Sequence, residues 1–164
     1  DELCENDSWC GETHLQKATY FLQDLLQVPT DFDFILYKHG PFSFDLRDEL
    51  TALRADCLLE LRPQLPYGPS LVTTEAGHAL EKQYPKTLKK HKKAIRFVAE
   101  QLGNKNVSEL ERLATALFVT LESGQRSTKE RANEIHSLKP HVTEQSATSA
   151  VEEVDAIIES AKHL

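Results

Sequence analysis

The stretch YKHGPFSFDL, residues 37–46, predicts the point at which an extended segment turns into a helix. Gly40-Pro41 is typical of a turn, and Pro41 has no N–H with which to continue a ladder of strand hydrogen bonds. Ser43 can cap a helix, and Asp45 in the first turn suits the helix dipole. The stretch therefore predicts a short strand that leads directly into a helix over 43–55, presented to a partner.

The segments on either side of this stretch complete a recognisable order of elements. Upstream, apolar residues spaced at three and four predict a helix over 13–27, and an aromatic, β-branched run predicts a strand over 32–37. Downstream, the pattern predicts a strand, a Pro/Gly-rich tip, a returning strand and a helix, over 58–62, 63–69, 70–73 and 75–83. This order of elements, a helix followed by two strands joined at a tip and then by a second helix, predicts a winged helix-turn-helix domain with a small β-wing over residues 1–84.

The second half of the chain has helical patterns throughout. A basic helix after Pro85 should end at Gly103, and SELE at 108–111 and STKE at 127–130 each have the spacing of a capping box. A last helix should begin near Thr143 and present an apolar stripe as far as Ala161. We therefore expect a helical C-terminal subdomain over 85–164 and a mainly α (α+β) fold.

Composition narrows the cellular location and the structural class that we expect for the protein. The chain has 164 residues, 40% of them apolar, which suffices for one compact domain or two small ones. No apolar run is long enough to cross a bilayer, and we expect no signal peptide at Asp1 and no membrane partner. Three cysteines are too few and too irregular for a disulfide framework, so a reducing, cytoplasmic setting fits best.

Charge is distributed unevenly along the chain. The net charge is −7, yet residues 77–105 contain 8 basic and 2 acidic residues, whereas residues 1–76 contain 5 basic and 14 acidic residues. An acidic balance disfavours non-specific nucleic-acid binding, and the basic segment partly restores it.

Several of these stretches resemble known families. GETHLQKATYFLQ (11–23) and YKHGPFSFDLRDELTAL (37–53) resemble the corresponding segments of the YwgA-like family of uncharacterised bacterial proteins, as does IHSLKPHV (135–142). LVTTEAGHAL (71–80) is similar to the segment that follows the wing in many winged-helix regulators, and the Panacea antitoxin domain shares the first two patterns more distantly. The resemblance implies a winged-helix fold and no established chemistry. The Panacea likeness implies, by analogy, an antitoxin-like or defence-associated role.

The helix over 43–55 and the wing supply the first candidate interface with DNA. In winged-helix regulators the helix before the wing enters the major groove, and an arginine there can read guanine. The candidates in this part are Ser43, Arg47, Thr51, Arg54 and, in the wing, Arg62. The same helix also exposes three acids, Asp45, Asp48 and Glu49, which suit a protein partner better than phosphate.

The basic helix supplies a second candidate interface. Lys86, Lys89, Lys90 and Lys93 fall on one helical face, and Arg96 follows them. That face suits a phosphate backbone or an acidic protein surface. The basic face is explained equally well as a solvent-exposed surface whose positive charge offsets the negative charge of the first domain.

Enzymatic and metal-binding readings have little support. The sequence has no phosphate-cradling glycine loop, nucleophile elbow or HExxH motif. Cys4, Cys10 and His14 could be imagined as zinc ligands, but a structural zinc site needs four. We expect His39 to be a turn residue, no cofactor and no enzymatic activity.

Two functions therefore remain open. The first is a cytoplasmic, homodimeric regulator that binds double-stranded DNA, with the helix over 43–55 as its presented helix. The second uses the same surfaces as a protein–protein interaction module without DNA contact.

Overall fold

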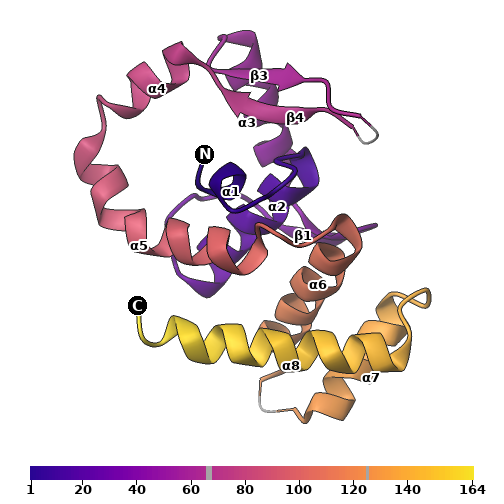
Figure 1. Cartoon of the computed structure of the whole chain (residues 1–164). Coiled ribbons are helices and arrows are strands. Elements are labelled where there is room, and N and C mark those ends of the chain that lie inside the picture. Colours follow the sequence, from indigo (N-terminus) through magenta and orange to yellow (C-terminus); the bar gives the residue numbers. More distant parts are fainter. Residues whose placement is uncertain (66–67, 125) are drawn as a thin grey trace.

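The computed structural model describes residues 1–65, 68–124 and 126–164, and these are mainly helical (Figure 1). The elements of the first half are α1 (Glu2–Glu5), α2 (Glu12–Tyr20), a π-helical turn η1 (Phe21–Leu25), β1 (Ile35–Tyr37), β2 (Gly40–Phe42), α3 (Phe44–Ala55), β3 (Leu59–Arg62), β4 (Ser70–Thr73) and α4 (Glu75–Glu81). Those of the second half are α5 (Pro85–Leu102), α6 (Val107–Ser123), α7 (Thr128–Leu138) and α8 (Glu144–Ala161). No helix in the described ranges is long and apolar enough to cross a membrane.

The helix-then-hairpin order predicted for the first half is present. Strands β3 and β4 pair antiparallel, with Leu59 opposite Thr73 and Arg62 opposite Ser70, and they follow α3 directly. The expected tip over 63–69 includes Pro66 and Tyr67, which lie outside the described residues.

The opening stretch folds differently from the prediction. The turn lies at Lys38 and His39, and Gly40-Pro41 forms part of β2, which pairs antiparallel with β1. Gly40 has a φ of +83°, a conformation open to glycine, and an added Cβ would lie 3.0 Å from the Thr115 hydroxyl of α6. Pro41 is tolerated because a two-stranded sheet has an outer edge at every strand, where a missing N–H breaks no ladder. Gly40 therefore allows both the positive φ after the turn and the close packing of β2 against α6.

Helix caps account for most of the boundaries. The hydroxyl of Ser43 accepts a hydrogen bond from the Leu46 N–H, and Thr74 caps α4 in the same way. The capping box predicted at Ser127 and Glu130 is confirmed. The box predicted at 108–111 is wrong: Asn106 and Glu109 form it, so α6 begins earlier.

The helix predicted over 13–27 is shorter and less regular. It begins at Glu12, after the Gly11 N-cap, and it widens into the π-helical turn after Tyr20. Such widened turns insert a residue into the regular spacing, which hydrophobic periodicity alone does not predict.

Two apolar cores lie on either side of α2. The larger one takes side chains from α2 and η1 and from α5 to α8, including Phe21, Leu117 and Val154, and so spans the boundary expected at residue 84. The smaller one is formed by Leu46, Leu50 and Leu71, beneath α3 and the β3–β4 sheet.

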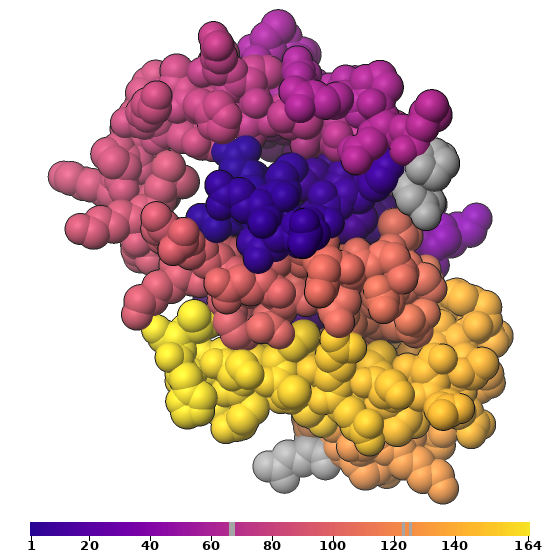
Figure 2. All heavy atoms as spheres, viewed as in Figure 1, coloured from indigo at the N-terminus to yellow at the C-terminus, as the bar shows by residue number. Residues whose placement is uncertain are grey.

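The arrangement leaves one helix partly unsupported. Helices α6, α7 and α8 pack on one another at one end of the molecule, with α3 and the β3–β4 sheet at the other (Figure 1). Helices α4 and α5 form an arc between them, and residues 81–90 are all exposed. Figure 2 shows open space between this arc and the N-terminal segment.

The cysteines differ from the expectation that they form no disulfide framework and suit a reducing setting. Cys4 and Cys10 form a disulfide, and Cys57 is free and exposed. Cys4 and Cys10, which the sequence disfavours as metal ligands together with His14, are bonded to each other. The Nε2 atom of His14 lies 3.1 Å from the Lys105 carbonyl oxygen.

Candidate functional site beside helix α3

Helix α3 is positioned by a buried glutamine of α2. The side-chain oxygen of Gln16 accepts a hydrogen bond from the Ser43 N–H (2.9 Å), and its amide donates to the Ser43 carbonyl (2.8 Å). Gln16 is fully buried, so the two bonds replace those that water would otherwise make. The first turn of α3 is thereby fixed against α2.

Two lysines fix the β1–β2 hairpin that precedes α3. The ammonium of Lys17 donates to the Pro41 carbonyl at 2.8 Å, and that of Lys139, which follows α7, donates to the carbonyls of Tyr37 and Lys38. Burial lowers the pKa of Lys17 to about 8, with the Glu111 carboxylate acting in the opposite direction. Burial also lowers the pKa of Lys139. Lysine side chains therefore donate hydrogen bonds to the backbone carbonyls of the β1–β2 hairpin.

The carboxylate of Glu111 lies between two exposed histidines. His39 Nδ1 is 3.2 Å from one carboxylate oxygen, and His141 Nε2 is 3.2 Å from the other. The His141 contact has an ion-pair distance without hydrogen-bond geometry, and that oxygen has no other partner among the described residues. His39 lies in the turn, as predicted. This cluster joins the hairpin to α6 and to the α7–α8 connection.

The exposed side of α3 faces a groove with a volume of about 810 Å³. We call it the α3 groove. Its walls are α3, the β3–β4 sheet, the loop before α2 and the α5–α6 turn. The lining residues are Asp7, Trp9, Gly11, Glu12, Thr13, His14, Arg47, Leu50, Thr51, Arg54, Leu61, Gly68, Pro69, Leu71, Asn104, Lys105, Asn106, Val107 and Ser108.

The α3 groove combines an apolar surface with mixed charge. Leu50 and Leu71 are buried beneath it, whereas Leu61 (40% exposed) and Val107 (48% exposed) offer apolar surface to a ligand. Arg54 makes no ion pair within the described ranges. The other two basic residues of the lining have partners within the chain. Arg47 pairs with Asp48 and lies over the Phe44 ring, and Lys105 pairs with Glu153.

The structure brings together part of the predicted DNA-reading set. Arg47, Thr51 and Arg54 all line the α3 groove, one turn apart along α3. Ser43 does not join them, because it is fully buried and caps α3. Arg62 is exposed on β3 and pairs with Glu60, outside the groove lining.

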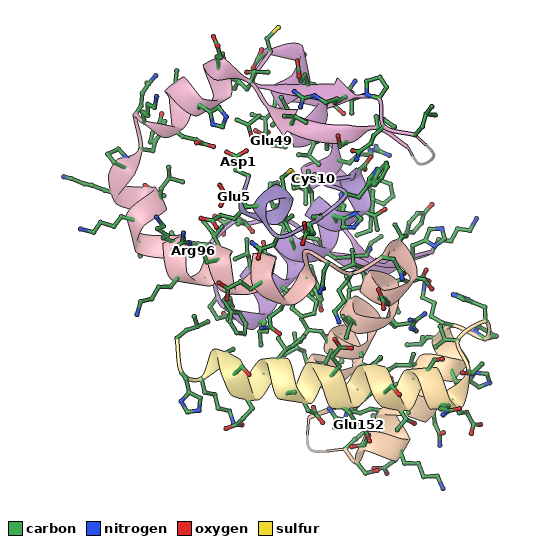
Figure 3. All side chains as sticks on the ribbon, in the orientation of Figure 1. Asp1, Glu5, Cys10, Glu49, Arg96 and Glu152 are labelled. Carbon is green, nitrogen blue, oxygen red and sulfur yellow. A yellow bond between two sulfur atoms is a disulfide. The ribbon has the colours of Figure 1, made fainter. Side chains whose placement is uncertain are left out.

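The predicted acidic and basic sets lie elsewhere. Asp45, Asp48 and Glu49 are exposed on α3 but do not line the groove, and Figure 3 labels Glu49 on the helix. The α5 candidates are exposed on the arc that α4 and α5 form, away from the β3–β4 strands (Figure 1); they are Lys86, Lys89, Lys90, Lys93 and Arg96.

Two members of the α5 set have partners within the chain. Lys93 donates to the Leu164 carbonyl, and Arg96 pairs with Glu2 where α5 runs alongside α1 (Figure 3). The α3 and α5 sets thus form two separate surfaces.

One carboxylate–imidazole cluster has donor atoms suited to a metal. Asp1, His78 and Glu81 bring three such atoms within 4.8 Å of one another, and all three residues are exposed. Exposed groups of this kind are common at surfaces, and among the described residues His78 makes no hydrogen bond to a buried group, so we assign the cluster no role.

Sequence reasoning missed the residues that hold the site. Gln16, Lys17, Glu111 and Lys139 are all buried, yet none was a candidate. A signal existed for two of them: Gln16 and Lys17 interrupt an apolar helix next to Leu15 and Ala18. A polar residue that must be buried there requires a partner, and irregular backbone nearby can provide it.

The likeness to the YwgA-like and Panacea families stays a prediction from sequence. Comparisons of the chain with protein-family models, with curated proteins and with solved structures give no match.

Proposed function

We propose that this chain is a winged-helix-type regulatory module that binds a segment of a protein partner in the α3 groove. The observation that carries the proposal is that the outward face of α3 forms a wall of a groove with exposed leucine and valine. A volume of about 810 Å³ lies within the range of small-ligand and peptide pockets. An extended or helical segment with apolar anchors suits such a surface.

The charges near α3 support a protein ligand over duplex DNA. Arg47 and Arg54 share the helix with the exposed acids Asp45, Asp48 and Glu49, so α3 has no net positive charge. Phosphate contacts supply much of the affinity for DNA, and a helix of this charge offers few of them. A partner segment with an apolar side chain for Leu61 and a carboxylate for Arg54 would match both features.

The test begins with a displayed library of random peptides, selected on the wild-type chain. A family of related peptides should be enriched, and Leu61→Asp should weaken its binding by roughly tenfold or more, as loss of an interface anchor does. Arg54→Glu should weaken peptides that carry a carboxylate. Glu60→Ala, one residue away on β3 and outside the groove lining, is the matched control.

Two results would reject the proposal. One is a library that yields no related peptides. The other is a Leu61→Asp variant that remains folded by circular dichroism and binds as tightly as the Glu60→Ala control.

A second candidate function, duplex DNA binding through α5, has its own observation. Lys86, Lys89 and Lys90 lie at the end of α5 where residues 85–90 are all exposed, and they make no ion pair within the described residues. Together with Lys93, four phosphate contacts would give a salt slope of roughly −3 to −4 in log affinity. Lys89→Glu with Lys93→Glu should flatten that slope in a titration with random duplex DNA. Absence of binding by the wild-type chain at low salt would exclude this candidate.

A further inference from the structure

One wall of the α3 groove is a short loop closed by the Cys4–Cys10 disulfide. Within this loop, Asp7 and Trp9 line the groove. The Trp9 indole N–H donates to the Gly68 carbonyl at 2.7 Å, and the Cys10 carbonyl accepts from the Leu71 N–H at 2.8 Å. The loop is therefore attached to the β3–β4 hairpin at Trp9 and Cys10, and the disulfide links Cys10 back to Cys4 of α1. Figure 3 shows Cys10 beside α1, close to the sheet.

The loop holds a backbone conformation that requires support. Asp7 (φ +62°) and Cys10 (φ +52°) both lie in the left-handed region, which residues with a Cβ rarely adopt. Such conformations persist only where the surroundings impose them. Helix α1 has four residues, too few to be stable alone. The disulfide joins α1 to Cys10, which precedes the Gly11 N-cap of α2, so it is one of the constraints that impose this conformation.

The two cysteine residues differ in exposure. Cys4 is exposed, whereas Cys10 is buried at 3% exposure. An external thiolate can therefore reach the Cys4 sulfur and displace the Cys10 sulfur as the leaving group. An accessible disulfide next to a strained loop has the features of a reversible pair rather than of an inert cross-link.

We propose that the Cys4–Cys10 pair is a thiol–disulfide switch that sets the position of Trp9 in the wall of the α3 groove. A dithiol reductant attacks the Cys4 sulfur, which breaks the S–S bond and forms a mixed disulfide, and Cys10 leaves as a thiolate that takes up a proton. The second thiol of the reductant then releases Cys4 and closes the disulfide of the reductant. Two electrons and two protons pass from the dithiol to the cysteine pair.

Reduction removes the covalent constraint on the loop. Asp7 and Cys10 then relax toward ordinary backbone conformations, and the Trp9 indole leaves the Gly68 carbonyl. The oxidised chain has the complete groove wall, and the reduced chain lacks it. As a consequence that rests on the proposed function, reduction weakens peptide binding in the groove by roughly tenfold, as loss of an aromatic contact does.

Trp9 is the one tryptophan in the sequence, so its fluorescence reports this wall directly. The experiment uses the Cys57→Ser chain, which cannot form disulfides through that exposed thiol, before and after dithiothreitol and after re-oxidation. We expect the emission to move to longer wavelength and acrylamide quenching to rise on reduction, and both to reverse on re-oxidation. Cys4→Ser with Cys10→Ser should resemble the reduced chain and should not respond to dithiothreitol.

Unchanged emission and quenching on complete reduction, verified by thiol labelling, would overturn the switch. Far-UV circular dichroism of the reduced chain separates release of the loop from general unfolding, and a global loss of helix would also overturn it. Fluorescence needs no peptide, so it decides the switch even if the peptide library fails and the proposed function falls. Peptide affinity that is equal in both redox states, with a clear change at Trp9, would overturn the link to binding and leave the proposed function intact.

Discussion

The β1–β2 hairpin and the α6–α8 helices are held in place by opposite kinds of side chain. The three helices bury alanine, valine, leucine and isoleucine against one another, and their backbone is satisfied within each helix. The hairpin and the start of α3 have carbonyl and N–H groups without such partners, and Gln16, Lys17 and Lys139 reach them from elsewhere. Regular backbone needs only apolar packing, whereas irregular backbone in an interior needs buried polar groups.

The largest effect should come from the apolar side of this comparison. Leu117→Ala removes a fully buried side chain of α6 and leaves a cavity, so the free energy of unfolding should fall by about 3 kcal/mol. Urea denaturation would measure the change. Leu121→Ala, at a position of the same helix that is 47% exposed, is the control and should change stability by about 0.5 kcal/mol or less. Equal losses in both variants would mean that this core does not depend on close packing.

A smaller but more local effect is expected at the hairpin. Gln16→Leu keeps the volume near that of glutamine but leaves the buried Ser43 N–H without its partner, while the Ser43 carbonyl keeps only the Arg47 N–H, which should cost about 2 kcal/mol. Because Ser43 caps α3, amide hydrogen exchange should accelerate most at Leu46 and Arg47. Gln83→Leu, at an exposed position, should change neither quantity. Unchanged protection at the start of α3 in Gln16→Leu would show that the cap holds without the glutamine.

The same comparison explains how far the sequence predicts the structure. The helices of the second half are predictable because the spacing of their apolar residues and caps is a local signal, as at Ser127 and Glu130. The start of α6 is the exception, because Ser108 and Glu111 have the right spacing for a cap while the Glu111 carboxylate instead interacts with Lys17 and the two histidines. Spacing alone does not reveal that competing use.

The candidate site is less predictable, because long-range pairs build it. Lys139 and Tyr37 are 102 residues apart in sequence, and no local pattern links them. The residues of α3 were predictable as an exposed set, and Arg47, Thr51 and Arg54 do lie together. The groove that they line depends on the loop at Trp9 and on the α5–α6 turn, which only the tertiary fold brings near.

The smallest predicted effect, per pH unit, is the pH dependence of the free energy of unfolding that arises from the buried lysine at the hairpin. Burial lowers the pKa of Lys17 to about 8 in the folded chain, whereas an unfolded lysine titrates near 10.5. Between these values the unfolded chain binds the extra proton, so the free energy of unfolding rises with pH, by about 1 kcal/mol per unit. Tyr20 acts in the opposite sense above about pH 10, because burial raises its pKa in the folded chain. The informative window is therefore pH 8 to 10.

The comparison of variants isolates the lysine. Lys17→Met should lose the rise that Lys17 causes, while Lys139, whose pKa burial also lowers, retains a contribution of the same sign. The gap between wild type and Lys17→Met should therefore change across the window, and that between wild type and the exposed control Lys86→Met should stay constant. Parallel curves for wild type and Lys17→Met would mean that Lys17 keeps its proton when folded. A rising curve would mean that folded Lys17 is neutral in this window, and a neutral amine can still donate to the Pro41 carbonyl without the cost of a buried charge.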